Sequence, residues 1–238
     1  MNDEPLLRLK GITKSFGSLV ANNSIHLDLY TGEILALLGE NGAGKTTLMN
    51  ILFGHYVADE GVVEIDGNTL TPGSPKEALR AGLGMVHQHF TLADNMTVLD
   101  NIMLGTESLL SLNRKDVQAI QKIKNLTNQY EIYVNPNVLV KNLSVGQRQR
   151  VEILKALYRD ARILILDEPT AVLTPQESER LFATLRLLVK EGLAIIFITH
   201  KLREVMAVSD RCLVLRHGRN IYQCRTGDTS MDTLAQQM

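Results

Sequence analysis

Short apolar runs joined by turn residues fill the first third of the chain. The segments 6–10, 25–30 and 62–65 have strand-like composition, and the pair Asp66-Gly67 is typical of a tight turn between strands. The run Ile34–Leu38 is wholly apolar, as expected of a strand that is buried on both faces. This pattern predicts an antiparallel β portion around one buried strand.

The last third of the chain alternates apolar runs with helical periodicity. The segments 163–166 and 195–198 are short and rich in β-branched residues, which favours strands inside a parallel sheet. Between them, apolar residues recur at helical spacing at Leu181, Leu185, Leu188 and Val189. A strand, a helix and a strand in this order predict a βαβ unit.

The middle of the chain has mostly helical periodicity and no run of comparable strand character. Its clearest helical pattern comprises Val117, Ile120, Ile123, Lys124 and Thr127. We therefore predict a single domain spanning 1–238, in which a helical subdomain of about 91–158 is inserted into a core of about 1–90 and 159–238. The sequence shows no internal repeat and no long linker rich in Pro, Gly or Ser.

Composition bounds the possible functions. The 238 residues are 45% hydrophobic, which supports a substantial core, and the formal net charge of -1 gives no electrostatic reason to expect nucleic-acid or membrane-surface binding. The longest apolar runs fall far short of the roughly 20 residues that cross a bilayer, and Asp3 and Glu4 stand where a signal peptide would be basic. We therefore expect a cytosolic location. Cys212 and Cys224 lack CxxC spacing and an evident ligand partner, so we interpret both as structural.

A glycine-rich loop follows the first buried strand. Residues 39–46 read Gly-Glu-Asn-Gly-Ala-Gly-Lys-Thr and lead into an apparent helix that begins near Lys45. In such a P-loop the backbone N–H groups turn toward phosphate oxygens, the lysine reaches the outer phosphates and the Thr46 hydroxyl can ligate Mg²⁺. The spacing therefore predicts a nucleoside triphosphate site. Its candidate binding residues are Gly39, Glu40, Asn41, Gly42, Ala43, Gly44, Lys45, Thr46 and Thr47.

Two carboxylates follow the apolar run 163–166. A buried strand that finishes in Asp167-Glu168 places charges where burial is costly unless a metal or a partner compensates them. Beside a P-loop, Asp167 can join the ligand shell of magnesium, and Glu168 can polarise a water for in-line attack on a γ-phosphate. If the pair stood alone, an acidic turn after a core strand would be the better interpretation.

A third motif lies between the other two. Residues 143–147 read Leu-Ser-Val-Gly-Gln and precede a predicted helix at 148–158. A helix N-cap at Ser144 would explain the pentapeptide alone. Between a P-loop and a strand that ends in Asp-Glu, however, it resembles the signature of the ATP-binding cassette (ABC) superfamily, whose usual form is Leu-Ser-Gly-Gly-Gln. Val145 departs from that form. Ser144, Gly146 and Gln147 are among the residues that match the usual form of the signature.

The resemblance extends over almost the entire chain and implies further site residues. Gln88 stands at the family's Q-loop, which contacts magnesium or water, and His200 stands at the switch histidine, which contacts the γ-phosphate. Phe16 matches the aromatic residue that stacks on adenine, with Val20 beside it. The ordinary alternatives are a solvated loop glutamine, a capping histidine and a core phenylalanine. His87 and His89, on either side of Gln88, could also be a His-x-His metal pair, but the sequence shows no evident third ligand.

Membership of the family would imply a fold and a reaction. The fold would be α/β, a P-loop NTPase ABC cassette with a mixed RecA-like core sheet, an N-terminal antiparallel β subdomain and an inserted helical subdomain. The ligands would be ATP and Mg²⁺, and the reaction would be ATP hydrolysis. The implied metal residues are Thr46, Gln88 and Asp167, and the implied catalytic residues are Glu168, His200 and Lys45.

The resemblance also implies partners. In the family, the signature of one cassette completes the ATP site at the P-loop of a second cassette. Residues 168–176 and 85–90 look most like those of ATPase subunits of bacterial importers for nucleosides or simple sugars. Such subunits work with transmembrane permease subunits and, indirectly, with an extracytoplasmic solute-binding protein, on the cytoplasmic side of the cell membrane and without nucleic acid. One copy of each motif fits the first half of a tandem protein and also a complete single-cassette subunit.

Other functions share some of these motifs. A soluble ABC ATPase of translation or DNA repair is the main alternative, but the sequence shows no charged linker, long coiled coil or zinc-binding cysteines. A P-loop kinase or GTPase needs no signature, and the Asn-Lys-x-Asp guanine motif is absent. Thr174 stands where many relatives have the D-loop aspartate, so the two sites of a dimer need not be equivalent.

Overall fold

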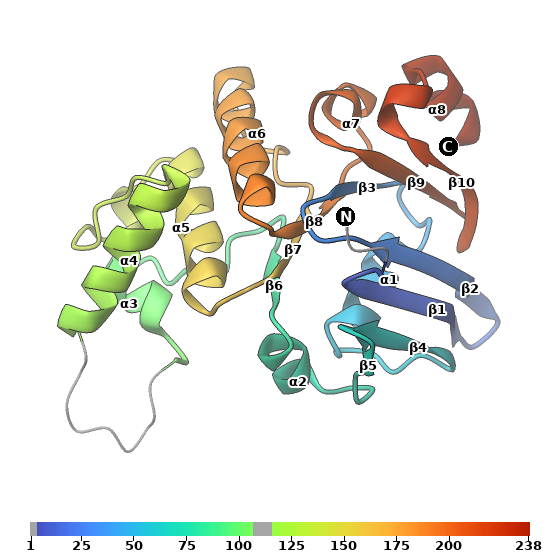
Figure 1. Ribbon diagram of the computed structural model, residues 1–238, viewed down its shortest axis with the longest axis horizontal. Helices are drawn as coiled ribbons and strands as arrows, with labels where there is room; N and C mark the ends of the chain where they lie inside the picture. Colours follow the sequence, from blue (N-terminus) through green and yellow to red (C-terminus); the bar gives the residue numbers. More distant parts are fainter. Residues whose placement is uncertain (1–3, 107–115) are drawn as a thin grey trace.

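The computed structural model describes residues 4–106 and 116–238, which form two sheets with helices around them (Figure 1). The smaller sheet is antiparallel, with strand order β2-β1-β4-β5. Its strands are β1 (Leu7–Phe16), β2 (Leu19–Leu29), β4 (Glu60–Ile65) and β5 (Asn68–Thr69). The predicted antiparallel portion is therefore confirmed. β1 and β2 extend well beyond the apolar segments, because their pairing continues to Phe16 and Leu19 at the turn.

The larger sheet is mixed, with strand order β10-β9-β3-β8-β7-β6. Its strands are β3 (Ile34–Leu38), β6 (Leu83–Val86), β7 (Ile163–Asp167), β8 (Ala194–Ile198), β9 (Arg211–Arg216) and β10 (Arg219–Arg225). β9 and β10 pair antiparallel, and the other neighbours pair parallel. The predicted βαβ unit is confirmed as β7, α6 (Pro175–Lys190) and β8. The strand before the P-loop, β3, lies between β8 and β9, which come from the last fifth of the chain.

The helices lie on both sides of the larger sheet and in a separate group at one end of the molecule (Figure 1). They are α1 (Lys45–Leu52), α2 (Pro75–Arg80), α3 (Val98–Met103), α4 (Asp116–Tyr130), α5 (Val145–Tyr158), α6 (Pro175–Lys190), α7 (Leu202–Val208) and α8 (Met231–Gln237), with 3₁₀ turns at Val140–Asn142 and Thr226–Asp228. α3, α4 and α5 form the separate group.

The predicted helical subdomain of about 91–158 corresponds to this group of helices. Residues 107–115 of that span lie outside the described residues. In the described part of the span there is no strand, only an isolated bridge between Thr97 and Leu139. The exact limits of the subdomain stay a prediction.

The core consists of two apolar layers, one on each face of the larger sheet. Alternate residues of β7 and β8 face either α5 and α6 or α1 and the smaller sheet, and nearly all are fully buried. Each fully buried Leu, Ile or Phe side chain contributes about 1.5–3 kcal/mol. Because both faces are buried, a strand cannot slip by one residue without placing apolar residues in the wrong layer. The carboxyl ends of the parallel strands are therefore fixed at one edge of the sheet.

Two features of the fold answer questions that the sequence raised. Cys212 on β9 lies opposite Cys224 on β10, with their sulfurs 3.3 Å apart and both thiols free. Burial, followed by the hydrogen bond to Cys224, raises the pKa of Cys212 to about 12.

Within residues 4–106 and 116–238, no helix has the length and apolar character needed to span a bilayer.

Candidate functional site

The glycine loop connects β3 to α1 and has room only for glycine at two positions. Gly39 and Gly44 have φ angles of 154° and 102°, the second deep in the left-handed region. A Cβ on Gly44 would collide with the Ala21 carbonyl oxygen, and one on Gly39 would collide with the Leu215 carbonyl oxygen. Gly44 is also the N-cap of α1, and no side chain among the described residues caps the helix there. The first amides of α1 are therefore left for a ligand.

Lys45 is almost enclosed beside this loop. Its side chain is 8% exposed, and its Nζ donates to the carbonyl oxygens of Gly39 at 2.7 Å and Glu40 at 2.9 Å. Burial lowers the pKa of Lys45, and the carboxylates of Glu168 and Asp167 oppose that shift. The lysine is therefore a positive charge whose hydrogen-bond acceptors are neutral carbonyl oxygens. Phosphate oxygens would take their place and form stronger, charge-assisted hydrogen bonds.

Asp167 ends β7, next to the P-loop. Burial raises the pKa of Asp167, and the neighbouring carboxylate of Glu168 raises it further, whereas His87 and Lys45 lower it. An ionised carboxylate in such a place is costly until a cation arrives. The residues predicted to hold magnesium supply oxygen donors, namely hydroxyl, carboxamide and carboxylate, which suit this ion. Among the described residues, no three His, Cys, Asp or Glu side chains are grouped so that they could hold a metal by themselves.

Glu168 has an unusual backbone. Its φ angle is 45°, in the left-handed region that residues with a Cβ seldom adopt. Its N–H donates to the Ile198 carbonyl oxygen at 3.0 Å, and its Oε1 lies 2.9 Å from Nδ1 of His200. The ends of β7 and β8 thus bring the predicted base and the predicted switch histidine into contact. Strain of this kind persists where surrounding contacts hold the residue, which is common at functional sites.

A cavity of about 430 Å³ joins these elements. The sequence-predicted residues that line it are Phe16, Val20, Asn41, Gly42, Gly44, Lys45, Thr46, Thr47, Gln88, Asp167 and Glu168. Gly39, Glu40, Ala43 and His200 do not line it. Of these, Glu40 and Ala43 line a neighbouring hollow of about 340 Å³, and His200 contacts the cavity only through Glu168.

Several lining residues were not predicted. His217 and Gly218 form the turn between β9 and β10 and line the same cavity, together with Leu19 and Ala21. Gly218 N–H donates to the Ala43 carbonyl at 3.1 Å, so this turn supports the P-loop from behind. Leu19 and Ala21 flank the predicted Val20 on β2, so their place in the chain could have indicated them. The turn at His217 and Gly218 is distant in sequence from the P-loop and carries no nucleotide-binding motif that could have identified it.

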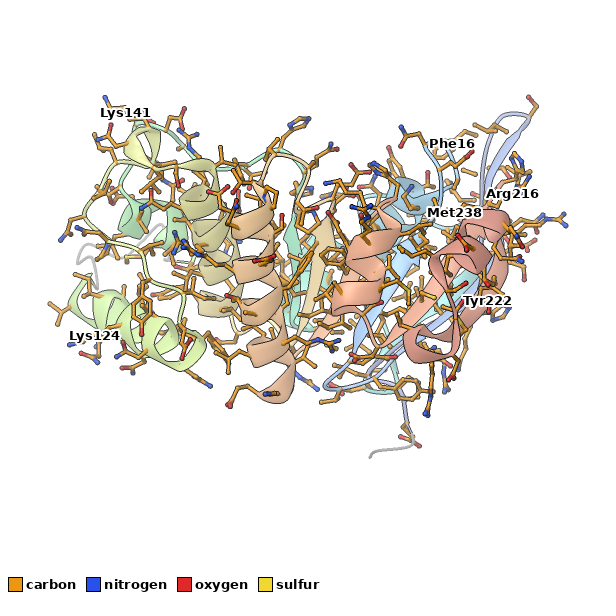
Figure 2. All side chains as sticks on the ribbon, turned by 90° about the horizontal axis from the view of Figure 1, so that it is seen from above. Phe16, Lys124, Lys141, Arg216, Tyr222 and Met238 are labelled. Atoms are coloured by element: carbon orange, nitrogen blue, oxygen red, sulfur yellow. The ribbon has the colours of Figure 1, made fainter. Side chains whose placement is uncertain are left out.

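Phe16 lies at the rim of the cavity and is 45% exposed. Figure 2 shows it at the end of the molecule opposite Lys124 of α4 and Lys141 of the 3₁₀ turn Val140–Asn142. The Tyr56 ring packs edge-on against it with centroids 5.6 Å apart, and the Lys14 ammonium lies 5.5 Å from its centroid. An exposed ring supported at its edge presents a face for stacking. The core alternative for this phenylalanine is therefore wrong.

The signature residues lie elsewhere. Ser144 and Gln147 form a capping box, in which Ser144 N–H donates to Gln147 Oε1 at 2.9 Å and Gln147 N–H donates to Ser144 Oγ at 3.3 Å. The predicted helix start at 148 is wrong, because this box begins α5 at Val145. Ser144, Gly146 and Gln147 line a separate cavity of about 660 Å³ against α6. In the described part of the chain, the signature and the P-loop do not share a cavity.

The fold and this site define a nucleotide-binding P-loop cassette, in which one motif of the set faces away from the phosphate cavity. A family model described as ABC transporter matches residues 22–171, and the chain belongs to this family. The resemblance and the α/β cassette fold expected from the sequence are thereby confirmed.

Individual relatives support this assignment. The chain is 50% identical over its whole length to the nucleoside import ATP-binding protein NupA of Lactococcus lactis, covering 47% of that protein. It is 46% identical to the glucose import ATP-binding protein TsgD13 of Haloferax volcanii, covering 48% of it. The crystal structure of a nucleotide-free ATP-binding cassette from an ABC transporter superposes with a TM-score of 0.83 at 27% identity, covering 93% of this chain and 91% of that one. The chain thus spans about half the length of the curated relatives it matches.

Proposed function

We propose that this chain binds and hydrolyses ATP to power an ABC importer for nucleosides or simple sugars. The proposal rests on one observation: Lys45, Asp167 and Glu168 line the same cavity, and His200 contacts Glu168. The names of relatives such as NupA and TsgD13 support import as the use of this chemistry, in preference to translation or DNA repair.

Each residue has a role in the proposed reaction. Lys45 and the uncapped amides of α1 bind the β- and γ-phosphates, and the Phe16 ring stacks on the base with Val20 beside it. Glu168 accepts a proton from the attacking water. The oxygen of that water bonds to the γ-phosphorus while the bond from the γ-phosphorus to the ADP oxygen breaks. His200, 2.9 Å from Glu168, orients that carboxylate and donates toward the γ-phosphate. Thr46, Gln88 and Asp167 would hold Mg²⁺, which supplies charge neutralisation of the phosphates.

A second cassette completes the proposed site. The signature residues border a different cavity from that of the P-loop, which supports a site completed by the signature of another cassette. The Ser144 hydroxyl, the Gly146 amide and the Gln147 side chain would then close over the partner's γ-phosphate, in line with the α5 dipole. We infer a dimer of cassettes that works with permease subunits on the cytoplasmic side of the membrane and, through them, with a solute-binding protein. The group α3–α5, in the inferred helical subdomain of about 91–158, is the proposed contact with the permease.

The variant Glu168→Gln tests the chemistry. It keeps the side-chain shape but cannot accept the proton, so we expect ATP turnover to fall by about 100-fold or more while ATP affinity is unchanged. Phosphate release and calorimetric titration measure the two quantities. Glu179→Gln, on the exposed surface of α6, makes the same charge change away from the site and should keep the wild-type rate. A wild-type rate in Glu168→Gln would refute the assigned base.

Capture from membranes tests the partners. The tagged chain, expressed in a cell that contains its natural permease, should recover a polytopic membrane protein. Recovery of ribosomes without any membrane subunit would contradict the transport function and favour the translation alternative.

A further inference from the structure

The loop that follows the predicted base is attached to the helix that carries the signature. Pro169 comes directly after Glu168, and its carbonyl oxygen accepts a hydrogen bond from Nε2 of Gln149 at 2.7 Å. Gln149 lies in the second turn of α5 and is only 3% exposed. A buried carboxamide that spans two elements in this way fixes their relative position, because breaking the bond would leave buried polar atoms unpaired.

This hydrogen bond acts on a strained part of the backbone. Glu168 has a φ angle of 45°, and the conformation needs support on both sides of the residue. On one side, Glu168 N–H donates to the Ile198 carbonyl at 3.0 Å. On the other side, Ala171 N–H donates to the Glu168 carbonyl at 3.1 Å, and the bond from Gln149 holds the carbonyl of Pro169 between them. If α5 moved relative to β7, the second support would move and the direction of the Glu168 side chain would change.

A second attachment joins the same two segments nearer the signature. Glu177, in the first turn of α6, accepts hydrogen bonds from Thr174 N–H at 3.0 Å and from Thr174 Oγ1 at 3.1 Å. Its other carboxylate oxygen lies 2.7 Å from the place where a Cβ on Gly146 would be. The Thr174 backbone and side-chain bonds, and then the Gly146 amide, lower the pKa of Glu177. Thr174 thus caps α6 as an aspartate would, and the Glu177 carboxylate occupies the space beside Gly146.

We propose that Gln149 is a positioning residue for ATP hydrolysis, which makes the orientation of Glu168 depend on the position of the signature helix in the same chain. The proposal rests on the proposed function, since it needs Glu168 as the base and the signature as the contact to a second nucleotide. Its consequence is specific. When α5 of one cassette engages the nucleotide of its partner, the base of that same cassette is held in its working direction through Pro169, with Glu177 as the second attachment.

The first test uses Gln149→Met in the full chain. Methionine keeps the length of the side chain and removes the donor to Pro169. We expect kcat to fall about tenfold and the Hill coefficient for ATP to drop from above 1 to about 1, with the affinity for ATP within twofold of wild type. Ser209→Ala is the matched control, because it removes a buried side-chain bond of 2.7 Å to the Val205 carbonyl in α7. It should lower the melting temperature but leave kcat and the Hill coefficient unchanged.

Hydrogen exchange without nucleotide separates this proposal from the proposed function. In Gln149→Met, the amides of Glu168 and Ala171 should exchange faster than in wild type, and in Ser209→Ala they should not. Unchanged exchange at Glu168 would overturn the positioning role, whatever the ATPase rate. Absence of ATPase in the wild-type chain would instead refute the proposed function.

If Gln149→Met does not fold, Glu177→Gln, at a more exposed position, tests the proposal instead. Its control is Glu179→Gln on the same helix. It should lower kcat and the Hill coefficient in the same direction by a smaller factor. Wild-type values of kcat and the Hill coefficient in Glu177→Gln, or in a folded Gln149→Met, or a wild-type chain with a Hill coefficient of 1, would overturn the proposal.

Discussion

The N-termini of α1 and α5 are both offered to phosphates in the proposed mechanism, but they are built in opposite ways. α1 begins after Gly44, with no side-chain cap among the described residues, and its entry is shaped by backbone atoms of β2 and of the β9–β10 turn. α5 begins with a complete Ser144–Gln147 capping box. The first end is kept open by a geometry that only glycine permits. The second is satisfied internally, so its hydrogen bonds must change partners before a phosphate can bind.

The charges of the first turns separate these two helices from the others. Where the structure describes the whole first turn, an acidic residue complements the dipole in α2, α3, α6, α7 and α8, but not in α1 or α5. For α5 a negative charge comes from Glu177 of another helix, whereas the first residue of α1, Lys45, is positive and adds to the positive end of the dipole. Both ends thus lack the negative charge of their own that would compete with an incoming anion.

The largest effect should come from closing the open end. Gly44→Ala places a Cβ against the Ala21 carbonyl in a left-handed backbone, and we expect a loss of about 3 kcal/mol or more of folding free energy. Gly42→Ala is the control, because its φ is also positive but no described atom outside its immediate neighbours lies within 4 Å of the new Cβ, and about 1–2 kcal/mol is expected. Urea unfolding measures both. Equal losses of folding free energy in the two variants would show that the backbone around Gly44 moves to make room for the Cβ.

Removing the charge at the open end should have the next largest effect. Lys45→Ala should weaken ATP binding by about 100-fold, because the charge-assisted bonds to the phosphates disappear. Lys76→Ala, an exposed lysine on α2, should bind ATP like the wild type. Calorimetric titration compares them, and unchanged affinity in Lys45→Ala would argue against the P-loop assignment.

The capped end should respond in stability before any nucleotide is added. Ser144→Ala removes the cap of α5 and should cost about 1 kcal/mol in the free chain. Ser230→Ala removes the corresponding cap of α8 and should cost a similar amount. Only Ser144→Ala should also reduce ATP turnover. Equal turnover in the two variants would show that the Ser144 hydroxyl serves the helix alone.

The smallest effect is a pH dependence at the open end. The pKa of Lys45 is lowered in the folded chain, so the unfolded chain binds the proton more tightly than the folded one. Stability from this group is therefore present above the unfolded pKa and is lost as the pH falls through the folded pKa. The stability of wild type relative to Lys45→Met should rise as the pH is raised toward 10.5, the ordinary pKa of a lysine, measured by thermal unfolding. A flat difference would contradict the shift.

The sequence predicted those parts of the site that lie in continuous motifs at strand ends. The P-loop and Asp167-Glu168 were predictable because parallel strands present their carboxyl ends at one edge of a sheet. We predicted the start of α5 at 148, three residues too late, although Ser144 followed three residues later by Gln147 is the pattern of a capping box. Tyr56, His217 and Gly218 were not predictable. Their contribution depends on how two sheets pack against each other, and no periodicity records that.

The position of β3 has a consequence for the order of folding. The strand that carries the phosphate loop is hydrogen-bonded to β8 on one side and to β9 on the other, and both strands are synthesised long after it. A nascent chain that has passed the glycine loop, the signature and the carboxylates still lacks both neighbours of its central strand. Such long-range parallel pairing closes slowly. We therefore expect the motif that stands early in the sequence to be among the last parts of the molecule to take its native shape.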